Sequence, residues 1–329
     1  MFQLFSWLIR YVVDAPIEFE KITISLKGRG FIYSEFGHYG HKYRHFLRSS
    51  QNYIDIDNIT QESKIVVPVG THEIPYSFKI PYNVPSTVNI YKYLVLCDCI
   101  VKCRIKYYIR IKFKRPGIFV RNIHFTKDII IHSLTPRLPR NPVMYEETKK
   151  LMRLFSSKHS YINIKATILK SVIPIGDKIG LHYEVENNSN ILVKSIETKI
   201  IEMCKFKATE YYEMRNEEIV PDTNAISSSI NCGDTQVIAI EVNIPPDLYS
   251  LDHAKIVTRD YFLRIEAALP IPHRNIVLNI PIQIGAIDEN MNILEEKAEC
   301  ITVTNSQPFH WDVMTETKKT NESGSLGTV

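Results

Sequence analysis

One segment alternates apolar and polar residues without a break from Cys103 to Arg115. The apolar positions are Cys103, Ile105, Tyr107, Ile109, Ile111 and Phe113. Successive side chains of a strand point to opposite faces, so the pattern predicts a strand with one face on a core and the other toward water. Pro116 and Gly117 end the segment, as expected for a turn.

Shorter segments repeat this alternation along the chain, at 22–26, 162–168 and 179–185. Turn signals at 174–177 and 187–190 separate the later ones. Gly is scarce, at 12 of 329 residues, and the Gly-rich motifs of phosphate-binding loops do not occur. At about 100–200 residues per domain, the length indicates two domains. The expected fold class is all-β, with two tandem immunoglobulin-like β-sandwiches.

The expected domain limits are 1–150 for the first sandwich and 161–287 for the second, with a linker at 151–160 and a flexible tail at 288–329. Three prolines at 136, 139 and 142 indicate a stiff, extended junction. The window 146–156 is the only one with a convincing helical pattern. The end of the chain, 316–329, is rich in Thr, Ser, Lys and Gly, a composition typical of disorder.

The cysteines and histidines do not predict a metal site. Cys97, Cys99 and Cys103 lack the paired spacing of zinc ligands, and on a strand they would share one face as small buried residues. His38, His41 and His45 fall in a Gly-containing stretch that is expected to be a loop. Neighbouring carboxylates resemble solvated faces, so we expect no enzyme activity and no cofactor.

Residues 1–13 are apolar, but they are short for a membrane span and lack the basic start of a signal peptide. The expected location is the cytoplasm, possible sites of membrane contact being the plasma membrane or endosomes. The alternative is a secreted two-sandwich binding module, which would carry glycans at Asn58 or Asn187.

The strongest candidate for a binding site is the basic row of the segment 103–115. Residues 1–150 carry a net charge of +11 and the remainder −7, so the first half favours an anionic partner. Alternate strand residues are about 6.5–7 Å apart, which suits separated phosphates or lipid headgroups. The alternative is a solvated sheet face; nucleic acid is not expected, because no groove-reading helix accompanies the row. The candidate residues are Arg104, Lys106, Arg110, Lys112, Lys114 and Arg115.

Several segments resemble the arrestin family when taken in order. These segments are 75–81 (PYSFKIP), 105–116 (IKYYIRIKFKRP), 174–189 (PIGDKIGLHYEVENNS), 244–246 (IPP) and 278–285 (LNIPIQIG). The likeness covers roughly residues 12–287 and is closest to the arrestin-domain-containing proteins, the alpha-arrestins. It implies an N-type and a C-type sandwich in a non-enzymatic adaptor or scaffold. Such an adaptor binds membrane receptors or transporters, some with phosphorylated tails, in protein transport, endocytosis or signal transduction.

Three departures from the family pattern accompany this resemblance. Only about twenty residues precede the strand at 22–26, so the first domain is expected to be shortened at its start. Residues 89–98 resemble an insertion. No Pro-Pro-x-Tyr motif is present, so coupling to the WW domains of ubiquitin ligases is not expected. The alternative function is therefore a structural arrestin-fold protein without ligase coupling.

Overall fold

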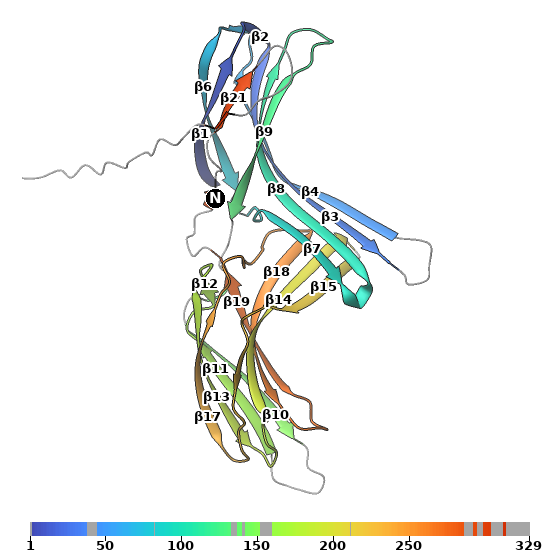
Figure 1. Ribbon diagram of the computed structural model, residues 1–329, viewed down its shortest axis with the longest axis vertical. Coiled ribbons are helices and arrows are strands. Elements are labelled where there is room, and N and C mark those ends of the chain that lie inside the picture. Colours follow the sequence, from blue (N-terminus) through green and yellow to red (C-terminus); the bar gives the residue numbers. More distant parts are fainter. Residues whose placement is uncertain are drawn as a thin grey trace, which may run out of the picture.

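The computed structural model describes residues 2–37, 45–81, 83–132, 137–139, 142–151, 160–210, 212–285, 292–294, 299–303 and 312–313. The elements are β-strands apart from one 3₁₀ turn, η1 (Val95–Cys97). The strands form two β-sandwiches arranged end to end (Figure 1). The expected all-β class with two tandem sandwiches is therefore confirmed. In the part of the chain that is described, no helix has the length and apolar character needed to cross a membrane.

The first sandwich has two main sheets and a short ribbon. One sheet contains β1 (Phe2–Val13) and β6 (Gly70–Pro81), and the ribbon pairs β2 (Ile17–Phe19) with β5 (Ile65–Val67). The other sheet contains β3 (Lys21–Phe36), β4 (His45–Gln61), β7 (Val88–Leu94), β8 (Cys99–Lys114) and β9 (Ile123–His132). Two strands thus precede β3, within the segment that was expected to be shortened. The insertion expected at 89–98 supplies most of β7 and η1.

Strand β8 lies at the centre of this sheet, between β3 on one side and β7 and β9 on the other. Its six predicted apolar positions are all buried. Tyr107 is among the largest fully buried side chains, and its hydroxyl donates a hydrogen bond of 2.6 Å to the carbonyl of Pro85. The predicted alternation therefore describes this strand correctly.

The second sandwich also has two sheets. One contains β10 (Val143–Leu151), β11 (Ser160–Ile168), β13 (Lys178–Asn188) and β17 (Thr235–Asn243). The other contains β12 (Val172–Ile173), β14 (Ser195–Thr209), β15 (Tyr212–Ile219), β16 (Ala225–Ser227), β18 (Val257–Ala268) and β19 (Ile276–Ile284). An aliphatic core fills the space between them.

The helix predicted at 146–156 is wrong for residues 146–151, and 152–156 lie outside the described residues. Residues 146–151 belong to β10, which pairs with β11 over its whole length. Val143 and Tyr145 pack against the core and Leu151 is buried in it, so pairing and packing override a weak local helical pattern. Strand β10 begins before the expected limit at residue 150 and yet belongs by pairing to the second sandwich.

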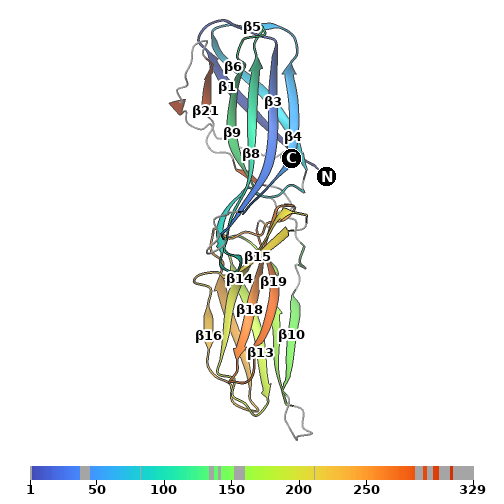
Figure 2. The same cartoon turned by 90° about the vertical axis from the view of Figure 1, so that its right-hand side faces the viewer.

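The range expected to be a flexible tail contributes three short strands. Strand β20 (Asn292–Leu294) pairs with β9, β21 (Glu299–Val303) pairs in parallel with β1, and β22 (Asp312–Val313) pairs with β21. Figure 2 shows β21 beside β1 at the first sandwich. Strand β21 satisfies backbone groups that β1 would otherwise present at a sheet edge. The end at 316–329 lies outside the described residues.

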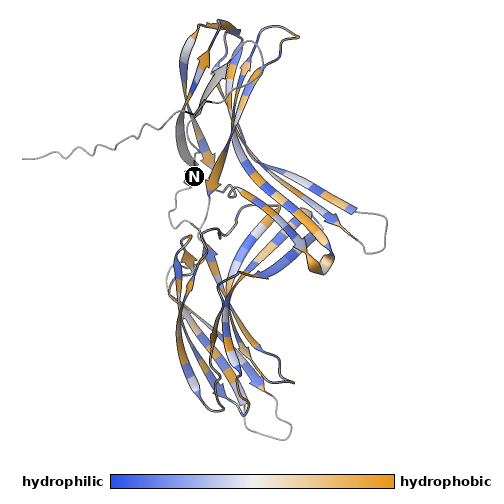
Figure 3. Cartoon of the chain, in the orientation of Figure 1, coloured by the Kyte–Doolittle hydropathy of each residue, from blue (hydrophilic) through white to orange (hydrophobic). Residues whose placement is uncertain are grey.

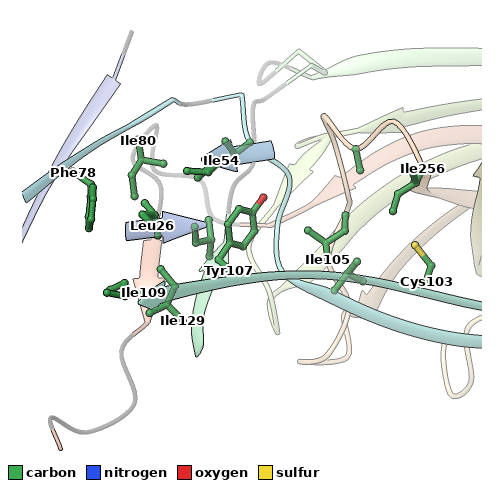
Figure 4. Packing of buried hydrophobic residues seen from close by; sticks show 14 of the residues in the cluster. Leu26, Ile54, Phe78, Ile80, Cys103, Ile105, Tyr107, Ile109, Ile129 and Ile256 are labelled. Atoms are coloured by element: carbon green, nitrogen blue, oxygen red, sulfur yellow. The ribbon is translucent and has the colours of Figure 1, made fainter. Parts of the chain in front are cut away.

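The two sandwiches share one continuous apolar cluster. Strands β3, β7 and β8 extend beyond the first sandwich and lie over β14 and β15 (Figure 1). Figure 4 shows Cys103 and Ile105 of β8 in the same cluster as Ile256 of the second sandwich. Phe206 and Met214, on β14 and β15, belong to it as well. The inner face of the extended sheet is thus buried, while its outer face remains open.

A candidate anion-binding face on the first sandwich

The outer face of β8 carries the predicted basic residues, because the residues between them fill the core. Arg104 and Lys112 are exposed, and Lys106 and Arg110 are half-buried. Figure 3 shows the resulting alternation of polar and apolar residues along the extended strands. The structure therefore places these four side chains on the same side of the sheet.

The six predicted residues do not form one uninterrupted site. The ammonium of Lys114 lies 2.8 Å from a carboxylate oxygen of Glu20, so part of its charge is neutralised. Arg115 follows the last residue of β8 and starts the turn toward β9. Tyr108 interrupts the row with a buried ring, and Lys106 Nζ and Arg110 Cζ lie 5.5 and 5.3 Å from its centroid.

Acidic residues surround this midpoint of the row. Lys27 lies opposite Tyr108 on β3, and its ammonium forms ion pairs with Asp55 and Asp57 on β4. Asp128 lies opposite Tyr108 on β9. The positive charge of the row is therefore partly offset at its midpoint, whereas the beginning of β8 has Glu35 of β3 beside it, which accepts a hydrogen bond of 3.2 Å from Tyr33.

The beginning of β8 and its neighbouring strands carry a denser group of cations. Arg29 lies opposite Lys106, and Tyr33 lies opposite both Lys102 and Arg48. We call this group the outer cationic face; it consists of Arg29, Arg48, Lys102, Arg104 and Lys106. Among the residues that the structure describes, none of the five forms an ion pair with a carboxylate. No described carboxylate therefore lies within ion-pairing distance of these five charges.

Aromatic rings are interleaved with these cations. The guanidinium carbon of Arg48 lies 5.4 Å from the ring centroid of Tyr33, and Lys102 Nζ lies 5.4 Å from that of Tyr91. Phe31 lies opposite Arg104 and is half-exposed. Rings at this distance hold a cation in place by attraction to the ring face. The face can thus offer several oriented donors to the oxygens of separated phosphates.

Sequence reasoning found Arg104 and Lys106 of this face but missed Arg29, Arg48 and Lys102. The alternation of Lys27, Arg29 and Phe31 with buried residues was a signal that β3 presents cations on one side. Which face this side joins depends on the register between β3 and β8, which the sequence alone does not reveal.

A second charged group lies on the other side of β7, at the junction of the sandwiches. Lys92 Nζ lies 2.7 Å from Glu202 Oε1 on β14 and also pairs with Glu218 on β15. Arg259 and the hydroxyl of Tyr261, both on β18, reach Glu202 Oε2 at 3.5 and 3.1 Å. Burial raises the pKa of Glu202, but the hydrogen bond from Lys92 and the nearby cations lower it by more, and the net shift is downward. This group is a structural tie between the sandwiches.

Arg137 forms a further pair of ionic contacts, with Asp252 and Asp260 of the second sandwich. Its guanidinium lies 2.5 Å from Asp252 and 3.0 Å from Asp260, and its backbone N–H donates to Gln283 Oε1 at 2.8 Å. Burial raises the pKa of Asp252 in spite of the Arg137 charge. Ion pairs of this kind connect residues more than a hundred positions apart, so the sequence pattern did not predict them.

Cys97, Cys99 and Cys103 were expected to share one face of a strand, and the structure does not bear this out. Cys99 and Cys103 point into the core, whereas Cys97 is exposed in η1, because the strand begins only at Cys99. His38 and His41 lie outside the described residues, and His45 starts β4. Across the described ranges, no group of three His, Cys, Asp or Glu residues could hold a metal ion.

A glycan at Asn187, one of the two sites that the alternative of a secreted module would use, does not fit the structure. The Asn187 side chain is fully buried, and its amide donates hydrogen bonds to the carbonyls of Ile191, Ile230 and Asn231. The amide nitrogen that a glycan would modify is thus engaged in holding a turn.

Comparison with known families agrees with this architecture. Residues 12–134 match the family model of the arrestin (or S-antigen) N-terminal domain, and residues 158–289 match that of the arrestin (or S-antigen) C-terminal domain. A search of curated proteins finds no match to the chain. The two matches fall on the first and second sandwich in the order expected from the sequence. The chain therefore belongs to the arrestin family.

Proposed function

We propose that this protein is a non-enzymatic, arrestin-like adaptor that binds the cytoplasmic tails of membrane receptors or transporters through the outer cationic face. The observation that carries the proposal is a set of five cations, none paired with a described carboxylate, on one face of the first sandwich. The domain limits of 1–150 and 161–287 remain a prediction, with β10 pairing across the first limit into the second sandwich. The similarity to the alpha-arrestins in particular remains a prediction.

The chemistry of the face favours a partner with several negative charges. Arg29 and Lys106 are neighbours across two strands, as are Tyr33 and Lys102. Adjacent strands lie about 4.8 Å apart and alternate residues about 7 Å apart, so neighbouring cations can reach different phosphates. Binding to such a set of charges weakens steeply with salt. A phosphorylated tail provides the phosphates, and an acidic membrane surface is the competing source of the same chemistry.

The proposed role places the protein in the cytoplasm, at the plasma membrane or endosomes, in receptor transport and signalling. Direct recruitment of ligase WW domains is not part of it, because no Pro-Pro-x-Tyr motif occurs in these 329 residues. The nearest sequence, Pro245-Pro246-Asp247-Leu248-Tyr249, has one residue too many.

The test compares a peptide carrying three phosphoserines with its unphosphorylated form. The variant combines Arg29→Glu, Arg104→Glu and Lys106→Glu. The control combines Lys165→Glu, Lys170→Glu and Lys194→Glu, which make the same charge change at exposed sites of the second sandwich. We expect the phosphopeptide to bind with a strong salt dependence and the variant to lose at least about tenfold in affinity.

Equal loss in the control would show that net charge, not this face, attracts the peptide. Unchanged binding by the variant would exclude the outer cationic face as the site. Vesicles with and without anionic lipid, added as competitors, distinguish a peptide site from a lipid headgroup site.

A further inference from the structure

The turn between β8 and β9, residues 115–122, presents two large apolar side chains entirely to solvent. Ile118 is 95% exposed and Phe119 is 99% exposed. Side chains so exposed contribute nothing to the core. Single exposed apolar residues are common, but an adjacent aromatic and aliphatic pair at a turn tip indicates a contact surface.

The turn is a built structure that holds these side chains outward. Gly117 has a φ of +104°, which favours glycine, and Val120 folds back so closely that a Cβ on Gly117 would lie 2.9 Å from its Cγ2. The Arg115 backbone N–H donates a hydrogen bond of 3.3 Å to the Asn122 side chain, which closes the turn. Val120, at 39%, is much less exposed than Ile118 and Phe119, which form the tip.

Cations lie behind this apolar tip on both strands that lead to it. Lys112 on β8 and Arg121 before β9 are exposed, and within the described chain neither forms an ion pair. Arg115 is half-buried beside them, and Lys114 already pairs with Glu20. An apolar tip followed by cations matches the profile of an anionic membrane, where charged headgroups overlie the acyl region by about 5–10 Å.

The position of the turn allows a flat surface to approach it. The turn projects from the end of the first sandwich that lies farthest from the second (Figure 1). Strand β5 lies at the same end (Figure 2), and Val66 on it and Val69 just after it are 62% and 59% exposed. A lipid surface could therefore contact the tip without meeting the second sandwich.

We propose that Ile118 and Phe119 insert into the interfacial layer of an anionic membrane while Lys112 and Arg121 bind its headgroup phosphates. A tip of two side chains is small compared with the roughly 1,600 Å² of a stable protein interface, and the adjacent cations complement an acidic bilayer. This inference goes beyond the proposed function, because the turn is separate from the outer cationic face.

The first test measures co-sedimentation of the full chain with phosphatidylcholine vesicles, with and without 30 mol% phosphatidylserine. We expect binding to the anionic vesicles only. The double variant Ile118→Ser/Phe119→Ser should reduce the partition coefficient at least about tenfold, and Arg121→Glu should reduce it about fivefold or more. The control is Ile271→Ser, at an isoleucine of the second sandwich that is 94% exposed, and it should bind like the wild type.

The second test uses Phe119→Trp and vesicles whose acyl chains carry a bromine quencher. We expect a blue shift and quenching beyond the signal of the two native tryptophans. Absence of wild-type binding to anionic vesicles, absence of quenching, or an unchanged partition of the double variant would each overturn the proposal. If the double variant still bound anionic vesicles but no longer bound a protein that the wild type binds, the tip would be assigned to a protein partner. Phosphopeptide binding should be unaffected by the double variant, so failure here is distinguishable from failure of the proposed function.

Discussion

Lys92 on β7 of the first sandwich and Glu202 on β14 of the second form an ion pair of 2.7 Å across the junction. The side chains are only 19% and 11% exposed, so little water compensates either charge if its partner is lost. The same carboxylate accepts a hydrogen bond from Tyr261 and faces Arg259. Glu202 therefore holds three elements of the junction together.

The substitution Glu202→Gln should destabilise the protein by about 3 kcal/mol, because it removes the carboxylate that the mostly buried Arg259 faces and leaves Lys92 with Glu218 alone. The urea midpoint of unfolding, followed by tryptophan fluorescence and circular dichroism, measures the loss. The matched control is Glu213→Gln, which removes the carboxylate partner of Arg215 in an exposed pair. The control should leave the midpoint unchanged. Equal midpoints for the two variants would contradict a stabilising role for the junction pair.

His132, at the end of β9, should make stability depend on pH. Its ring packs edge-on against Tyr249 of the second sandwich at 5.9 Å, and burial lowers its pKa below the ordinary value of 6.5. The unfolded chain takes up a proton near pH 6.5 that the folded chain resists. The free energy of unfolding should therefore be retained above pH 6.5 and fall as the pH drops toward the lowered value.

Urea midpoints at pH 7.5 and 5.5 check this dependence. His132→Phe should reduce the difference between the two midpoints, whereas His124→Gln, at an exposed position of the same strand, should preserve it. A wild-type difference that survives in His132→Phe would assign the dependence to another group.

The sequence predicts those parts of the fold that depend on neighbours along the chain. The alternation from Cys103 to Arg115 defined both faces of β8, because a strand has no other way to bury every second residue. The helix predicted at 146–156 was wrong for residues 146–151 for the opposite reason. Their local pattern is weakly helical, but pairing with β11 makes them a strand. Strand pairing is a long-range interaction that local propensity does not contain.

The candidate site shows the same division. Arg104 and Lys106 follow from periodicity on β8, but Arg29 joins them only through the register with β3. Lys114 was included in the predicted basic row because nothing in the sequence shows that Glu20, which is distant along the chain, pairs with it. The residues that one strand contributes to a site can thus be predicted from the sequence. The residues that neighbouring strands contribute, and the carboxylates that pair with them, depend on how the strands assemble into the sheet.

Gly28 on β3 should not tolerate a side chain. A Cβ at this position would lie 2.4 Å from Cε1 of the fully buried Tyr107, whose hydroxyl is held by the Pro85 carbonyl. Gly28→Ala should therefore destabilise the first sandwich by about 1–3 kcal/mol, by forcing the ring and backbone apart. Gly180→Ala is the matched control, since its nearest neighbour would be Leu169 at an ordinary 3.6 Å. Thermal unfolding compares the two, and equal melting temperatures would show that Tyr107 moves aside at no cost.

The reactivity of the cysteines tests the burial of the β8 face and the junction in one measurement. Cys97 and Cys232 are exposed, whereas Cys99, Cys103 and Cys204 are buried. Burial raises the pKa of each of these three thiols to about 12, so at pH 8 only about one in ten thousand is the reactive thiolate.

In a Cys300→Ser background, a thiol reagent at pH 8 should label two cysteines rapidly, and the other three only after denaturant is added. Mass spectrometry identifies the labelled peptides, and Cys97→Ser should remove one of the two rapid events. Rapid labelling of Cys103 or Cys204 in the native protein would mean that the junction opens, since both belong to the apolar cluster that the two sandwiches share.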